Sequence, residues 1–107
     1  MFLSELLASY AAERPDLAPC TARYLGYSIN NFRRFLCHEP SLSDLNKQTI
    51  LAWMTWSGKE IAARSVNHHR VNIISLWNHA ADLDLISPPP KIAKTDRYSH
   101  PGKGIKF

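Results

Sequence analysis

The chain of 107 residues has few cysteines and no long apolar run, and each shortage excludes a class of protein. Its two cysteines, Cys20 and Cys37, have the spacing of neither a disulfide framework nor a zinc site, which favours free thiols in a reducing compartment. No apolar segment reaches the roughly 20 residues that cross a bilayer. The N-terminal segment carries Glu5 and lacks a basic leader. We therefore expect a cytoplasmic protein with no membrane partner.

Basic residues outnumber acidic ones by thirteen to nine, but the excess lies in the C-terminal tail. From Ser87 onward there is one acid, Asp96, against five basic residues, Lys91, Lys94, Arg97, Lys103 and Lys106. The body before Ser87 is therefore neutral, with eight residues of each sign. Its charges are nevertheless segregated, because three arginines and no acid lie between Leu17 and His38. Uneven placement of this kind is typical of a one-sided binder of polyanions, although a small domain also acquires it by chance.

The spacing of apolar residues predicts four amphipathic helices, at about residues 2–13, 20–37, 47–57 and 61–85. Pro15 ends the first helix, and the pair Glu39-Pro40 ends the second. Asn46 is a favourable N-cap for the third helix, and Gly58 closes it. We expect residues 41–46 to form a loop. The fold class is therefore all-α, with four helices and an extended basic C-terminal tail.

Two opposed faces are predicted on the second helix. One is an apolar stripe for the core, formed by Leu25, Ile29, Phe32 and Leu36. The other has the same spacing, offset by about half a turn, and holds Arg23, Tyr27, Asn30 and Arg34. A solvated surface is the ordinary role of such a polar face. A face with arginines and no acid also suits contacts with nucleic-acid phosphates.

The fourth helix, within the stretch from Gly58 to Pro90, is predicted to be the central element of the core. Its inner face is centred on Val66 and includes Ile73, Trp77 and Ala80. Its outer face holds Arg64, His68, Asn72, Ser75 and His79. The first turns combine the positive end of the helix dipole with donors from Lys59, Arg64 and Asn67, which favours a phosphate there. The adjacent pair His68-His69 does not have the spacing of a metal site, so we expect no metal and no cofactor.

The order and spacing of these residues resemble the core-binding domain of the tyrosine recombinases, the phage-integrase family. The fourth helix carries the pattern without a gap, in Ser65, Asn67, His68, Arg70, Ile73, Leu76, Trp77, Ala80, Leu85, Ile86 and Ser87-Pro88. Upstream, the matching positions are Thr21, Leu25, Ile29, Phe32, Phe35-Leu36, Leu42, Asp44-Leu45, Ile50, Trp53 and Gly58. The sequence departs from the pattern at two positions, where the family usually has Arg in place of His68 and Leu in place of Arg70.

The resemblance implies a SAM-like, orthogonal four-helix bundle over residues 1–86, followed by a basic linker over residues 87–107. In the family this bundle grips one side of the recombination-site duplex, and a separate catalytic domain of the same protein cuts and rejoins the strands. The partners implied are double-stranded DNA, that catalytic domain and further recombinase protomers on the DNA. The catalytic arginine, histidine and tyrosine set has no counterpart here, and Tyr98 lies in a tail without such partners. We therefore expect this chain to be inactive as an enzyme by itself.

We predict that DNA is contacted mainly at its phosphates by Arg23, Asn30, Arg34, Lys59, Arg64, Asn67 and His68, with added affinity from the tail lysines. The alternative is a helical protein–protein interaction module, because a fold of this kind does not determine its function.

Overall fold

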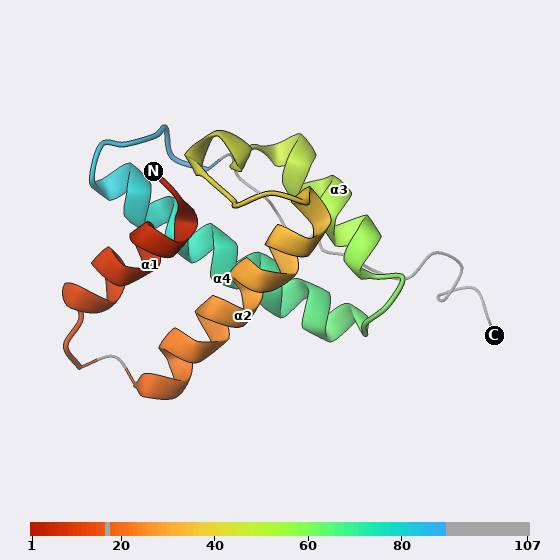
Figure 1. Cartoon of the computed structure of the whole chain (residues 1–107), viewed down its shortest axis with the longest axis horizontal. Coiled ribbons are helices and arrows are strands. Elements are labelled where there is room, and N and C mark those ends of the chain that lie inside the picture. Colours follow the sequence, from red (N-terminus) through yellow and green to blue (C-terminus); the bar gives the residue numbers. More distant parts are fainter. Residues whose placement is uncertain (17, 90–107) are drawn as a thin grey trace.

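The computed structural model describes residues 1–16 and 18–89, and these form an all-α globule (Figure 1). Its elements are α1 (Leu3–Ala12), α2 (Pro19–Leu36), the short 3-10 helix η1 (Leu42–Asp44), α3 (Lys47–Ser57) and α4 (Ala63–Asp82). The described part of the chain contains no β-strand, and Phe2 and Ser41 form an isolated bridge. The prediction of an all-α fold is confirmed. The predicted tail lies outside the described residues from Pro90 onward.

The ends of the first three helices follow from the residues that flank them. The carboxylate of Glu5 accepts a hydrogen bond from the backbone N–H of Phe2 at 2.8 Å, which satisfies a free donor at the start of α1. The side chain of Asn46 accepts from the N–H of Thr49 at 2.8 Å and caps α3 as predicted. Cys37 follows the last residue of α2 as its C-cap, and its φ of 61° places it in the left-handed region.

The fourth helix is shorter at both ends than the sequence predicts. It begins after Ala62, two residues later than expected, and ends at Asp82 instead of near Leu85. Asp84 has a φ of 60°, and this left-handed residue turns the chain away from the helix axis. The predicted loop at 41–46 also contains η1, where the Asp44 carboxylate accepts from the N–H of Ser41 at 2.9 Å.

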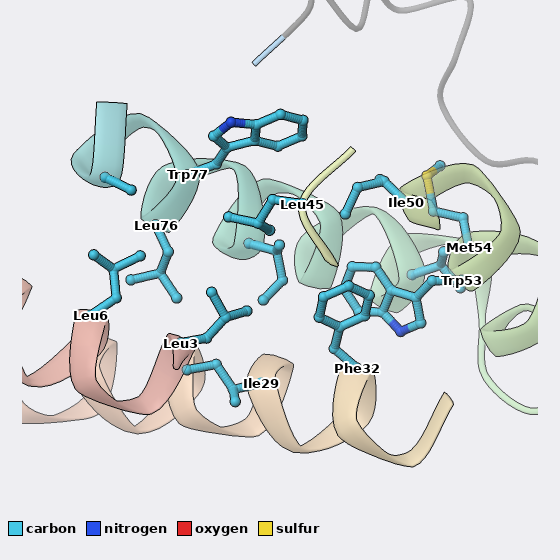
Figure 2. Packing of buried hydrophobic residues seen from close by; sticks show 13 residues of the cluster. Leu3, Leu6, Ile29, Phe32, Leu45, Ile50, Trp53, Met54, Leu76 and Trp77 are labelled. Carbon is cyan, nitrogen blue, oxygen red and sulfur yellow. The ribbon is translucent and has the colours of Figure 1, made fainter. Parts of the chain in front are cut away.

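The core lies between α4 and the other three helices, each of which contacts α4. Leu3 and Leu6 of α1 and Ile29 and Phe32 of α2 point into it (Figure 2). The remaining buried members of the cluster are Leu45, Ile50, Trp53, Met54, Val66, Ile73, Leu76, Trp77 and Ala80. The predicted inner face of the fourth helix is thus buried, and burial of large apolar side chains is the main source of stability here.

One residue predicted to point outward from the fourth helix is instead buried. His79 is 8% exposed, and its Nε2 lies 3.2 Å from Ser9 Oγ in α1 and 3.5 Å from Oε2 of Glu13, the residue after α1. Its ring also packs edge-on against Tyr10. The expectation was wrong because a helical wheel assumes one buried side, whereas α1 covers a second side of α4 near its C-terminal end.

None of the helices in the described ranges is long and apolar enough to cross a membrane.

Candidate functional site

The candidate site is built on the crossing of α2 and α4. In Figure 1, α2 passes in front of α4, and the N-terminal halves of the two helices diverge from the crossing. The buried hydroxyl of Ser28 holds them together, because it lies 2.7 Å from His69 Nδ1 and accepts from Asn72 Nδ2 at 2.8 Å. The same Oγ lies 3.2 Å from the carbonyl oxygen of Tyr24. Two polar groups of α4 are therefore fixed against one residue of α2.

The surroundings of His69 favour the neutral form of its ring. Burial lowers the pKa of His69 below the usual 6.5, and the neighbouring imidazole of His68 lowers it further. The indole of Trp53 lies on the core side of His69, with ring centroids 6.4 Å apart. A neutral ring with Nδ1 hydrogen-bonded to Ser28 leaves Nε2 as the nitrogen available to a ligand.

Between the diverging halves of the helices lies an open groove of about 650 Å³. It is lined by two residues of α2 and five of α4, namely Tyr24, Tyr27, Ser65, His68, His69, Val71 and Asn72. The tyrosines are 58% and 51% exposed, and their ring centroids are 6.1 Å apart at an interplanar angle of 62°. We call this feature the α2/α4 groove. Its walls combine aromatic faces with hydroxyl, imidazole and amide groups.

Arginines flank the α2/α4 groove on both helices. Arg23 precedes Tyr27 by one helical turn, and Arg64 precedes His68 by one turn. Both arginines are exposed, as is Lys59 in the connection before α4. Within the described ranges none of these three side chains has a carboxylate partner. Their charges are therefore available to an anion in solution.

Arg34 differs from these cations because it already has two partners. Its guanidinium lies 3.6 Å from the Glu60 carboxylate, and both side chains are largely exposed. It also lies over the ring of Trp56, 5.8 Å from the centroid. An exposed ion pair of this kind contributes little stability and exchanges readily for another anion.

Acidic residues are almost absent from the helices that form the groove. Helix α2 contains none, and the sole acid in α4 is its last residue, Asp82. Glu60 is the exception nearby, in the connection before α4. The opposite charge pattern occurs beside α1, where Glu5, Glu13 and Asp16 lie. The surface formed by α2 and the first half of α4 is consequently cationic.

The structure places the predicted contact residues in different settings. Arg23, Arg34, Lys59, Arg64 and His68 are exposed, and His68 lines the groove. Asn30 is exposed and accepts a hydrogen bond from Arg33, whose guanidinium also pairs with Glu39 at 3.0 Å. Asn67 is 7% exposed, and its amide donates to the carbonyl oxygen of Ala63 at 2.9 Å. Its side chain thus offers little surface to a ligand.

Six residues that line the groove were not among the predicted contacts: Tyr24, Tyr27, Ser65, His69, Val71 and Asn72. One pattern in the sequence points to part of this set. Tyr24 and Tyr27 are three residues apart and lie off the apolar stripe of α2, so two large rings share an exposed face. The residues of α4 that line the groove form no comparable sequence pattern, because their position in the groove depends on where α2 crosses α4.

Within the described residues no group of three or more histidines, cysteines or acids is arranged to hold a metal ion. Comparison of the chain with protein-family models, with curated proteins and with solved structures gave no significant match. The recombinase resemblance therefore rests on the residue pattern alone.

Proposed function

We propose that this chain is a DNA-binding module, and that it binds the phosphates of a duplex through the exposed side of α2 and the first half of α4. We call this surface the α2/α4 face. The observation that carries the proposal is the distribution of charge: Arg23, Lys59 and Arg64 have no carboxylate partner in the described chain, and α2 has no acid at all. Arginine and lysine side chains supply most of the sequence-independent affinity for DNA by displacing counterions.

The start of α4 adds a second source of attraction for a phosphate. Its N-cap is Ala62, which provides no side-chain hydrogen bond to the first turn. The backbone N–H groups of that turn therefore keep their donor capacity, and the helix dipole favours an anion there. Arg64 lies in the same turn, and Lys59 lies shortly before it.

The finer proposal is that the module is the core-binding domain of a tyrosine recombinase, a SAM-like bundle whose catalytic domain lies elsewhere in the parent protein. In support, the apolar positions of the family pattern have a consistent role. Ile73, Leu76, Trp77 and Ala80 are all buried in the core, as residues that define a fold should be. Ser65 and His68 of the same pattern lie in the groove.

Titration of duplex DNA at several salt concentrations tests the proposal. The logarithm of the binding constant falls linearly with the logarithm of the salt concentration. If Arg23 and Arg64 each neutralise one phosphate, replacing either by alanine makes this negative slope less steep by about 0.9. Arg14→Ala is the matched control, since Arg14 lies over the Tyr10 ring of α1, outside α2 and α4, and its loss changes the net charge equally. Equal slopes for Arg23→Ala, Arg64→Ala and Arg14→Ala would refute the assignment of this face.

The cationic tail requires its own control, because it supplies non-specific affinity in any basic protein. A chain that stops after Pro89 removes the tail and keeps Ser87, whose carbonyl oxygen accepts from Trp77 Nε1 at 2.9 Å. We expect this truncated chain to bind duplex DNA more weakly and to retain its dependence on Arg23 and Arg64. Complete loss of binding would assign the affinity to the tail.

The alternative, a protein–protein interaction module, is favoured by the exposed rings of Tyr24 and Tyr27 and by Val71 beside them. A protein partner bound with an affinity that salt does not change, together with no duplex binding at low salt, would select this alternative.

A further inference from the structure

We propose that the α2/α4 groove is a nucleobase site, which holds one unpaired nucleotide of a DNA strand with its base stacked on Tyr24 or Tyr27. The site is distinct from duplex phosphate binding, because a base becomes available to a side chain only when it leaves the helical stack. The inference goes beyond the proposed function, which concerns duplex phosphates, and it uses the same flanking arginines.

The aromatic geometry of the groove is the first argument. The rings of Tyr24 and Tyr27 meet at 62° with centroids 6.1 Å apart, so they form a corner and not a closed stack. Each ring is about half exposed. One ring can therefore lie flat against a base while the other closes its edge. Aromatic faces in such a position bind any base, because every base presents a π-face.

Polar groups along the groove supply the second argument. Four polar side chains of the groove have no hydrogen-bond partner within the described chain. They are the hydroxyls of Tyr24, Tyr27 and Ser65 and the ring of His68. His69 also lines the groove, and its hydrogen bond to Ser28 occupies Nδ1, which leaves Nε2 as the second ring nitrogen. These donors and acceptors border one space of about 650 Å³, a volume within the usual range for a small organic ligand. Donors and acceptors of these kinds can pair with the polar edge of a base.

Charge complementarity selects a nucleotide over a peptide as the occupant. None of the residues that line the groove is acidic, and Arg23 and Arg64 lie one turn from its lining on the two helices. A base that enters the groove carries phosphates on either side, and an arginine on each wall places a positive charge near them. A proline-rich or helical peptide would use the tyrosines and leave both arginines without a role.

The test compares two single strands of ten residues, oligothymidine and an abasic strand, which carry the same phosphates and differ only in bases. We expect the full chain to bind oligothymidine about tenfold more tightly, as measured by fluorescence anisotropy. The double variant Tyr24→Ala/Tyr27→Ala should bind both strands equally. Tyr24→Phe/Tyr27→Phe should keep the preference, because phenylalanine still stacks. Arg23→Ala/Arg64→Ala should lower the affinity for both strands by the same factor and leave the preference for oligothymidine unchanged.

Three results would overturn the inference. These are equal affinity of the natural chain for the two strands, a preference that persists without both tyrosines, and a proline-rich peptide that perturbs Tyr24 and Tyr27 in NMR spectra when oligothymidine does not. Duplex binding measured on the same samples reports separately on the proposed function. If the chain binds duplex DNA but binds the two single strands equally, the result supports the phosphate-binding surface and refutes the nucleobase site. Both tyrosines are exposed, so we expect the tyrosine variants to fold. Circular dichroism checks that their helix content is unchanged.

Discussion

Ser28 on α2 and His69 on α4 lie with Oγ and Nδ1 2.7 Å apart, at the point where the two helices cross. Asn72 donates to the same Oγ at 2.8 Å. This contact sets the separation of the groove walls, because Tyr24 and Tyr27 lie within one turn of Ser28 while Ser65 and His68 lie within about one turn of His69. One buried hydroxyl therefore contributes both to stability and to the geometry of the candidate site.

Replacing Ser28 by alanine should lower the free energy of unfolding by about 1–3 kcal/mol, because it leaves polar groups of His69 and Asn72 without their partner. Urea denaturation measures the change. Ser75→Ala is the matched control, since the Ser75 hydroxyl bonds only to the Val71 carbonyl of its own helix, and we expect a change of about 0.5 kcal/mol or less. Equal effects of the two substitutions would contradict the importance given to the crossing.

The pKa of His69 should be measurably below 6.5, chiefly because of burial and secondarily because of His68. The unfolded chain then binds the proton more readily than the folded chain. His69 therefore contributes its full stabilisation above pH 6.5, and the free energy of unfolding falls as the pH drops from 6.5 through the lowered value. NMR titration of the imidazole signals gives the pKa directly. His68→Gln should raise it toward 6.5, and a wild-type value at or above 6.5 would refute this account.

Much of the fold was predictable from local sequence because strong local rules act at its helix ends. Pro19 suits the first turn of α2, and Asn46 caps α3 by the hydrogen bond that its residue type favours. The apolar stripe of α2 was predictable for the same reason, since Leu25, Ile29 and Phe32 recur at helical spacing and are buried.

The candidate site was only partly predictable, because its polar groups depend on contacts between distant segments. Asn72 was assigned to an outer face, yet it bonds to Ser28, 44 residues away in the sequence. Periodicity indicates which side of a helix is apolar, but it does not indicate where another helix crosses. The exposure of Arg23 and Arg64 was predictable from helix periodicity alone. The groove between α2 and α4 was not, because it depends on where the two helices cross.

Replacing Cys37 by glycine should stabilise the protein by about 0.5–1 kcal/mol, because Cys37 ends α2 in the left-handed region where a side chain is strained. The other exposed cysteine provides the control. Cys20 lies in the first turn of α2, so Cys20→Gly should have a smaller effect of the opposite sign, since glycine weakens a helix. Thermal denaturation of both variants under reducing conditions measures the difference. A destabilised Cys37→Gly chain would show that the left-handed cap is not strained.

Removing the carboxylate of Glu60 should strengthen duplex binding, if the α2/α4 face is the DNA surface. Glu60 lies 3.6 Å from Arg34 and is the acid nearest to Lys59 and Arg64 in the sequence. Glu60→Gln frees Arg34 for a phosphate and removes a repulsion of up to about 1 kcal/mol in water, so we expect affinity to rise roughly two- to fivefold at low salt.

The stability of Glu60→Gln should change by less than about 1 kcal/mol, because both partners of the ion pair are exposed. Asp82→Asn is the matched control, since it makes the same change of charge at the far end of α4, beyond the groove, and should increase affinity much less. Equal gains for the two variants would indicate that DNA responds only to net charge. That result would remove the reason for assigning the contact to Arg34 and its neighbours.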